Sequence, residues 1–531
     1  MITRASLVLA MVSMVSAMTG TFPARPAAAA PAPSGPTGAA LAEILARFDA
    51  YAESSRQRWG VPGMAVAVIQ GQSVVLAKGY GVRVAGEPAR VDPATVFQIG
   101  SISKSFTATV MGLLVDEGKL AFEDRVVDRY PAFQMADPWV TREFMVWDLM
   151  AQHSGLAPYA GDAGVLFGHT RQDIMARLRL LPPVASFRSQ FSYVNNLWVV
   201  AAAVEEAVTG TSWEALVADR VFAPLGMSSA STGAEALLGA GNVALPHALA
   251  GDRPVPMREN DLALAAPYVV GPAGGINASV RDVANYVIAH LNHGLFHDRT
   301  VLRPETARWL HTPKTIVALR GPANVEQGAL AQGPAFYTQG WLYQLLGPTP
   351  LVWHNGGTSG SKAVAAFTPD GDLGVVVLTN LIGTQLPEAL MYHLYDLYYG
   401  RPAKDYTGPF RDEERAQADA GQFPSPPTRP APPRDLAVYA GAYRHPYYGR
   451  LVAEVRDGRL ELRTGPARTL IPSRHWDGDT FAIAVPSGAP PTYTDGFASF
   501  ALGPDGKVSE LRFTRFFTDA GEGRFEREPD R

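Results

Sequence analysis

Two side chains with complementary chemistry, Ser101 and Lys104, lie three residues apart at the start of a predicted helix. Apolar residues recur behind them at helical spacing, at Phe106, Val110, Leu113 and Leu114. Gly118 is a stop signal for this helix. Because side chains three apart share one helix face, the lysine nitrogen can reach the serine hydroxyl. This arrangement is typical of a serine nucleophile that is activated by a lysine.

The same spacing has an ordinary explanation, in which the serine caps free N–H groups of a helix and the lysine is solvated. A second match, Ser359 and Lys362, shows that the spacing alone is not specific. That match follows a Gly-rich run and precedes a strand-like segment, so no helix aligns its two side chains. The context therefore favours Ser101 and Lys104 as the reactive pair.

A serine nucleophile also needs a group that takes its proton and returns it to the leaving group. No carboxylate–histidine relay is evident from the sequence order. Tyr193 lies just before a helical run over residues 197–208, and a phenol beside a lysine could move this proton. Asn195 offers both a donor and an acceptor to a substrate amide or to Lys104. The ordinary alternative is that Tyr193 is an aromatic core residue.

A glycine-rich stretch over residues 353–360 contains His354, Gly356 and Gly357 and starts where strand-like segments return. Glycines let a substrate approach the backbone, and an exposed N–H group here could pair with that of Ser101 as an oxyanion hole. The ordinary alternative is a hairpin turn that carries a surface histidine.

Four residues, His290, His293, His297 and Asp298, resemble a metal-binding cluster by their spacing. They match no hydrolytic zinc signature, and their surroundings do not suggest the supporting groups that orient metal ligands. We therefore expect no metal at this cluster and no cofactor in the protein.

The elements that must position these residues fall into two groups. Helical spacing over 38–58 and strand-like runs within 64–82 precede the reactive pair. A mostly helical region covers 120–240, and strand-like runs return within 363–379. Sheet-forming segments at both ends of residues 37–400 predict an α/β domain, with an antiparallel sheet flanked by helices and an inserted all-helical subdomain.

The C-terminal part of the chain has a different pattern. Residues 401–434 are polar and then Pro-rich, which is typical of a linker. Short strand-like runs separated by turns occupy residues 435–531. This pattern predicts a small C-terminal β-barrel.

Composition excludes several classes of protein. The 531 residues carry a formal net charge of −4 and no basic cluster, which argues against a nucleic-acid partner. The absence of cysteine excludes a disulfide or a thiolate nucleophile. No later segment has the roughly 20 consecutive apolar residues that a membrane-spanning helix needs. We expect no membrane span in the mature chain.

The N-terminal residues predict export from the cell. Arg4 supplies a positive charge, residues 5–18 are apolar, and small residues that suit cleavage follow. We expect residues 1–30 to be a signal peptide and residues 31–36 to be a linker. The protein is then periplasmic or secreted.

Three motifs, taken in their order along the chain, resemble those of the serine β-lactamase and penicillin-binding-protein superfamily. They are Ser101-x-x-Lys104, Tyr193-x-Asn195 and His354-x-Gly356. The sequence is most similar to the class C β-lactamase-like branch, which includes D-aminopeptidases, D,D-peptidases and esterases. The resemblance covers about residues 40–400, and the C-terminal part resembles the lipocalin-like barrel often appended to such hydrolases.

The resemblance implies a role for each matching residue. Ser101 would be the nucleophile, with Lys104 and Tyr193 sharing the proton transfers. Asn195 would orient the substrate and the lysine. The backbone N–H groups of Ser101 and Gly357 would form the oxyanion hole.

Two residues of the third motif depart from the pattern of many relatives. His354 stands where they carry the lysine of a Lys-Thr-Gly strand, and Asn355 replaces the usual hydroxyl residue. With Gly356, His354 would bind substrate. A histidine has an ordinary pKa of about 6.5, so it anchors a substrate carboxylate less well than a lysine does at neutral pH. We expect weak or no β-lactamase activity.

The sequence therefore predicts an exported serine hydrolase that works through an acyl-enzyme on a small molecule or a peptide. A peptidase or amidase is expected first, and a carboxylesterase is the alternative. A second alternative is a penicillin-binding or sensor protein with little turnover. The sequence leaves a homo-oligomer open.

Overall fold

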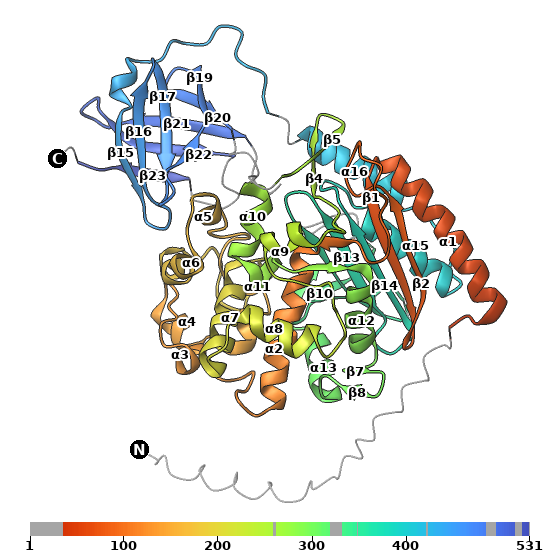
Figure 1. The fold of residues 1–531 in the computed structure, drawn as a ribbon. Helices are drawn as coiled ribbons and strands as arrows, with labels where there is room; N and C mark the ends of the chain where they lie inside the picture. The colour runs from red at the N-terminus through yellow and green to blue at the C-terminus, as the bar shows by residue number, and fades with distance from the viewer. Residues whose placement is uncertain are drawn as a thin grey trace, which may run out of the picture. The chain divides into compact units, whose positions relative to one another are not determined.

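Antiparallel strands from both ends of the hydrolase domain build one eight-stranded sheet, in the order β2-β1-β14-β13-β12-β11-β10-β9 (Figure 1). Its strands are β1 Gly63–Gln70, β2 Ser73–Gly81, β9 Thr315–Ala318, β10 Ala335–Tyr337, β11 Leu342–Gln344, β12 Leu351–Gly357, β13 Lys362–Phe367 and β14 Leu373–Thr379. In the centre, Val66 of β1 pairs with Val377 of β14, and Val364 of β13 pairs with the same residue from the other side. The N-terminal hairpin therefore adds to the C-terminal strands, as the sequence predicts.

The computed structural model describes residues 35–258, 262–318, 332–347, 349–420, 423–484, 495–515 and 523–529. The predicted signal peptide lies outside these residues, as does most of the predicted linker over 31–36. No helix of the described part of the chain is long and apolar enough to cross a membrane.

Helices cover both faces of the sheet. As a result, every residue of the central strand β14 is buried. The helix α12 Val280–Leu291 packs against β1, β13 and β14. On the other face, α15 Leu386–Tyr398 packs against β13 and β14, and α1 Gly38–Trp59 packs against α15 (Figure 1). These covered strands are continuous apolar runs, as expected for a sheet that is buried on both sides.

The helical subdomain lies between β3 Val96–Gln98 and β6 Asn277–Ser279, which pair with each other. Its helices are α2 Ser103–Asp116, α3 Val126–Arg129, α4 Pro138–Glu143, α5 Ala163–Leu166, α6 Arg171–Arg177, α7 Asn196–Thr209, α8 Trp213–Val217, α9 Ala234–Gly239, α10 Leu262–Val269 and α11 Gly271–Gly274. Three short 3₁₀-helices are η1 Gly100–Ile102, η2 Val146–Leu149 and η3 Leu178–Leu180, and η4 Ala218–Phe222 is a π-helical turn. The smaller remaining elements are β4 His247–Ala250, β5 Arg253–Pro256, β7 Leu295–Phe296, β8 Arg299–Thr300 and α13 Pro304–His311. The inserted subdomain is thus almost wholly helical, as the sequence predicts.

The C-terminal strands form a nine-stranded antiparallel sheet in the order β18-β17-β16-β15-β23-β22-β21-β20-β19. After η5 Leu436–Val438, they are β15 Gly441–His445, β16 Gly449–Arg456, β17 Arg459–Thr464, β18 Thr469–Ile471, β19 Ser473–Asp477, β20 Thr480–Ile483, β21 Gly496–Leu502, β22 Val508–Thr514 and β23 Arg524–Arg527. Because β17 also contacts β19, the sheet nearly closes on itself. The predicted fold class, an α/β domain followed by a small β-barrel, is confirmed.

The stretch over 401–434, which we expected to be a linker, contains a helix, α16 Thr407–Ala420. This helix packs against α15 and buries Phe410 beside Tyr392. Its amphipathic pattern is weak because the sequence is mostly polar, and few apolar residues mark its buried face. The Pro-rich residues that follow have no regular secondary structure in the described part.

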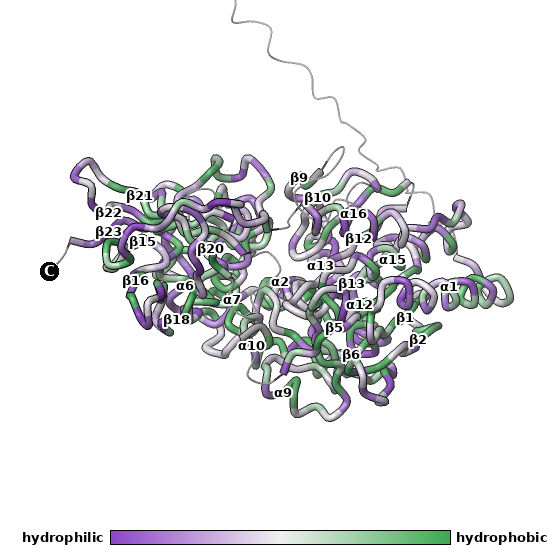
Figure 2. Tube along the Cα trace, turned by 90° about the horizontal axis from the view of Figure 1, so that it is seen from above, coloured by the Kyte–Doolittle hydropathy of each residue, from purple (hydrophilic) through white to green (hydrophobic). Residues whose placement is uncertain are grey.

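Buried hydrophobic side chains form a continuous cluster that runs from the sheet into the barrel. It includes Val66 and Val377 of the sheet and Tyr443 and Leu511 of the barrel. Figure 2 shows hydrophobic residues along the elements of both parts. The barrel is therefore packed onto the hydrolase domain and shares its core.

Two buried histidines behind α2 predict a loss of stability in acid. The rings of His290 and His311 are hydrogen-bonded at 2.9 Å between Nδ1 and Nε2. Burial lowers the pKa of His290 to about 3 and that of His311 well below its ordinary value. Since the unfolded chain takes up protons first, stability is complete above about pH 6.5 and falls below it; the contribution of His290 is about 2 kcal/mol at pH 5.

Urea unfolding at pH 7 and pH 5 measures this loss, and His290→Gln is expected to reduce the difference between the two midpoints. Equal midpoints of the unmodified protein at both pH values would contradict the expectation.

Candidate active site

The turn that carries Ser101 is fixed by the residues around it. Gly100 has a φ of +53°, a left-handed conformation that favours glycine, and the chain then enters η1 and α2. The Ser103 hydroxyl donates to the Gly100 carbonyl at 2.7 Å and accepts from the Ile276 N–H at 3.0 Å. Ser101 therefore projects from a clamped turn, and its Oγ lies 3.1 Å from Lys104 Nζ. The predicted pair is brought together.

Lys104 has the environment of a base. Its side chain is fully buried, its Nζ donates to the Ala273 carbonyl at 2.8 Å, and Nζ lies 4.7 Å from the centre of the Tyr193 ring. Burial lowers the pKa of Lys104 to about 7, and the Asp162 carboxylate partly opposes this shift. A neutral amine that donates one N–H to Ala273 keeps a lone pair for the Ser101 proton.

Tyr193 lies on a short segment before α7 that one side chain holds in place. Gln152 accepts from the Val194 N–H at 2.7 Å through its side chain and from the Ser192 N–H at 2.8 Å through its carbonyl. Gln152 itself has a φ of +57°, which is unusual for a residue other than glycine. No motif in the sequence marks Gln152, and the structure shows that it holds the segment of Tyr193 beside Lys104.

Asn195 lies at the start of α7 and contacts a residue that the sequence analysis missed. Its Nδ2 donates to Asp162 Oδ2 at 2.6 Å. Both side chains line the cavity that contains Ser101. Asp162 is far from Asn195 in sequence and belongs to no local motif, so only the fold brings it to the site.

The strand β12 lies directly against the turn of Ser101. A Cβ on Gly356 would overlap the Ile99 carbonyl, and a Cβ on Gly100 would lie 2.7 Å from the Gly357 nitrogen. Only glycines permit this approach. The backbones of Ser101 and Gly357 therefore lie close together at the cavity, as the predicted oxyanion hole requires.

His354 is buried and neutral. Burial, assisted by the nearby Lys104 ammonium, lowers its pKa to about 3. Its Nδ1 lies 2.5 Å from the Asn355 carbonyl, so Nδ1 carries the proton and Nε2 accepts from the Tyr337 hydroxyl at 3.0 Å. The site thus has no cation at the position of the lysine in the Lys-Thr-Gly strand.

The second Ser-x-x-Lys match has a different arrangement. Lys362 Nζ lies 3.1 Å from Glu388 Oε1, and the same carboxylate oxygen accepts from Asn355 Nδ2 at 2.8 Å. Glu388 is fully buried on α15. Lys362 therefore forms an ion pair beside the cavity, and Ser359 lines the cavity wall.

The cavity at Ser101 has a volume of about 260 Å³ and mostly apolar walls. Its apolar side chains are Val165, Leu166, Phe191, Val270, Val317, Leu342 and Ile382. Its polar side chains include Ser101, Asp162, Tyr193 and Asn195, together with the stretch that contributes His354, Asn355, Thr358, Ser359 and Lys362. This combination of a small reactive cluster and an apolar wall suits a substrate with an apolar group next to the reacting bond.

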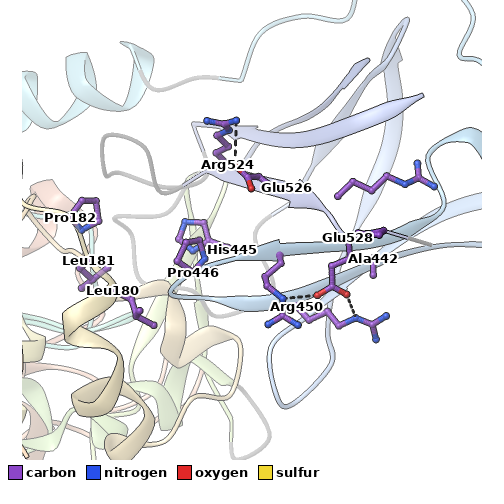
Figure 3. A pocket seen from close by; sticks show the side chains of 13 residues that line it. Leu180, Leu181, Pro182, Ala442, His445, Pro446, Arg450, Arg524, Glu526 and Glu528 are labelled. Atoms are coloured by element: carbon purple, nitrogen blue, oxygen red, sulfur yellow. Dashed lines mark hydrogen bonds and ion pairs between the residues drawn. The ribbon is translucent and has the colours of Figure 1, made fainter. Parts of the chain in front are cut away.

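A larger cavity of about 890 Å³ lies beside the barrel strands β15, β16 and β23 (Figure 3). Arg444 and Arg450 pair with Glu528 there, at 2.6 and 3.0 Å. None of its lining residues is a serine or a lysine. The reactive chemistry therefore belongs to the smaller cavity.

The histidine cluster does not come together as a metal site. No group of three histidine, aspartate or glutamate side chains within the described ranges could hold a metal ion. His290 faces His311, while His293 lies 3.8 Å from Asp370. The contact between His290 and His311 lies in the core behind α2, so these histidines point to different partners.

Comparisons with known proteins agree with this geometry. The model of the Beta-lactamase family matches residues 19–398, and a domain of unknown function, DUF3471, matches residues 425–527. The unguisins hydrolase ungD of Aspergillus violaceofuscus is 28% identical over 507 residues, with 84% of each chain covered. Penicillin-binding protein 4 of Amycolatopsis lactamdurans is 28% identical over 409 residues, which are 75% of this chain and 96% of that protein.

A solved structure shares the fold. The octameric penicillin-binding protein homologue from Pyrococcus abyssi superposes with a TM-score of 0.59 and 23% identity, over 91% of this chain and 99% of that chain. Fold, site geometry and family model lead to one assignment. The chain belongs to the Beta-lactamase family.

Proposed function

We propose that the protein is an exported serine hydrolase that cleaves a peptide or amide bond through an acyl-enzyme on Ser101. One observation carries the proposal: Ser101 Oγ lies 3.1 Å from the nitrogen of a buried lysine whose pKa is lowered to about 7. A neutral lysine in contact with a serine hydroxyl is the requirement for making that hydroxyl a nucleophile.

The proposed cycle has two halves. Lys104 takes the Ser101 proton while Oγ attacks the carbonyl, and the N–H groups of Ser101 and Gly357 stabilise the oxyanion. The proton then passes to the leaving amine through Lys104 or Tyr193, and the acyl-enzyme remains. Water, deprotonated by the same groups, attacks the ester carbonyl. The bond to Ser101 Oγ then breaks, the acid leaves, and the proton taken from the water passes from Lys104 or Tyr193 to Oγ.

The walls of the site argue for a substrate without a carboxylate beside the scissile bond. His354 is neutral, and the Lys362 ammonium is already paired with Glu388. An amide or ester with an apolar group suits these surroundings better than a β-lactam. The names of two relatives, a hydrolase and a penicillin-binding protein, support acyl transfer in general.

Two alternatives stay within the same chemistry. A carboxylesterase is favoured by the same mostly apolar wall, since an ester needs no charged anchor. A penicillin-binding or sensor protein would acylate Ser101 without releasing the product. Export to the periplasm or medium is part of the proposal and is supported by Arg4 and the apolar residues 5–18.

A substrate panel tests the proposal. It contains p-nitrophenyl esters, D- and L-aminoacyl amides, D-Ala-D-Ala peptides and nitrocefin, each measured with the unmodified protein and with Ser101→Ala. We expect hydrolysis of amides or esters, little with nitrocefin, and none by the variant. A stable mass increase with a β-lactam, without turnover of any substrate, would favour the sensor alternative.

Tyr193→Phe is expected to lower the acylation rate by a factor on the order of 100 to 10,000, the usual weight of a group that transfers protons. The phenylalanine keeps the ring contact with Lys104 but has no hydroxyl. Stopped-flow acylation measures the change, with Tyr159→Phe as a control from the same cavity wall. An unchanged rate would assign the proton transfers to Lys104 alone.

A further inference from the structure

One residue of the C-terminal barrel enters the hydrolase domain behind the active site. The side chain of Tyr447 is fully buried. Its hydroxyl donates to the Gly161 carbonyl at 3.1 Å and accepts from Asn196 Nδ2 at 3.4 Å. Its own carbonyl accepts from Arg177 Nη1 at 2.6 Å. Tyr447 is therefore anchored on both sides by the helical subdomain.

The two partners of this hydroxyl are next to two cavity residues in sequence. Gly161 precedes Asp162, and Asn196 follows Asn195. Asp162 and Asn195 are joined by the 2.6 Å hydrogen bond at the cavity. Tyr447 thus connects, from behind, the two backbone segments whose side chains meet in front.

A second set of contacts supports the apolar wall. Thr469 of β18 donates through Oγ1 to the Leu166 carbonyl at 3.0 Å, and the Ala467 N–H donates to the Phe167 carbonyl at 3.3 Å. Leu166 lines the cavity at Ser101. Both contacts lie at the end of α5, so the barrel holds the helix that carries part of the substrate wall.

The larger cavity borders this junction on one side. Figure 3 shows Pro446 and His445, which directly precede Tyr447, opposite Leu181 and Pro182. Open space separates the two parts there, while Tyr447 fills the adjacent position completely. The barrel therefore contacts the subdomain beside this cavity, at Tyr447 behind Asp162 and Asn195 and at the end of α5.

We propose that the C-terminal barrel completes the active site of the hydrolase domain, with Tyr447 as the positioning residue that holds Asp162 and Asn195 beside Lys104. This rests on the proposed reaction at Ser101. The barrel acts through backbone and buried side chains and touches no substrate itself. The hydrolase domain alone would have the nucleophile and the lysine, but its substrate-facing amide and carboxylate would be free to shift.

Tyr447→Phe tests this role because it removes the hydroxyl and keeps the ring. The groups around the Lys104 amine are the Asp162 carboxylate, the Tyr193 ring and the neutral His354. Asp162 supplies the negative charge that raises the lysine pKa, so its displacement lowers that pKa. We expect kcat/KM to fall about tenfold, the scale of one misplaced polar contact, and the acid limb of its pH profile to move to lower pH.

The matched control is Tyr443→Phe. Tyr443 is also fully buried, but its hydroxyl donates at 2.7 Å to the Tyr439 carbonyl within the barrel. Tyr443→Phe is expected to keep kcat/KM and the pH profile even where its unfolding temperature falls. The proposal is overturned if Tyr447→Phe has the profile of the unmodified protein, or if both variants change it equally.

A second variant keeps the test decisive if Tyr447→Phe does not fold. Thr469→Val removes the hydrogen bond to the Leu166 carbonyl and is expected to raise KM severalfold for acyl amides with large apolar groups. An unchanged KM would overturn the proposal. Ser101→Ala, assayed on the same substrates, separately decides whether the reaction occurs at Ser101, so failure of the proposed function is distinguishable from failure of this inference.

Discussion

Ser101→Ala is expected to lower kcat by a factor on the order of 10⁶, the scale reached when the nucleophile of a coupled catalytic set is removed. In the proposed cycle the Ser101 hydroxyl forms the acyl-enzyme, and no neighbouring group replaces it. The fold is expected to remain intact, because the turn is held by Ser103 and Gly100. Initial rates and a thermal unfolding scan on the same sample measure both effects.

The second Ser-x-x-Lys match supplies the control. Ser359→Ala removes the serine of that match, whose lysine is paired with Glu388. We expect the kcat of Ser359→Ala to fall by less than a factor of ten. Intact-protein mass spectrometry after a rapid quench should detect the acyl adduct in the unmodified protein and in Ser359→Ala. Full activity of Ser101→Ala would exclude Ser101 as the nucleophile.

Lys104→Met is expected to lower kcat/KM by a factor on the order of 10³ to 10⁴, the upper part of the range for a general base. Methionine keeps an unbranched apolar stem in the buried position and has no amine. In the unmodified protein, kcat/KM should be constant above about pH 7 and fall tenfold per pH unit below it, because the protonated lysine cannot accept the Ser101 proton.

Asp162→Asn is the partner measurement for this pH profile. The carboxylate raises the pKa of Lys104, so its removal should move the acid limb to lower pH. A profile with no inflection near pH 7 in the unmodified protein would show that Lys104 is not the base. An acid limb that is unchanged in Asp162→Asn would exclude a charge effect of Asp162 on the lysine.

The reactive pair could be predicted because its geometry is local. Ser101 and Lys104 share a helical turn, and helical spacing is visible in the sequence. The sheet was predictable for a similar reason, since the hairpins over 64–82 and 363–379 carry their own turn signals. The fold class followed from the order of these segments along the chain.

The residues that surround the pair could not be predicted in this way. Asp162 meets Asn195, and Glu388 meets Lys362, only after distant segments pack together. The charge state of His354 depends on burial, which a single sequence does not specify. The helix α16 was missed because its sequence is polar and lies among residues typical of a linker.

The position of Tyr447 in the chain has a consequence for synthesis. Its hydroxyl contacts residues that lie 286 and 251 positions earlier. At about 5–20 residues per second, a ribosome takes roughly 13 to 50 s to synthesise the shorter of these two stretches, from Asn196 to Tyr447. Throughout that time the nucleophile and its lysine already exist, but the residue behind Asp162 and Asn195 does not. On the proposal above, Asp162 and Asn195 gain their support from behind only after the last domain has folded, so full activity is expected only from the complete chain.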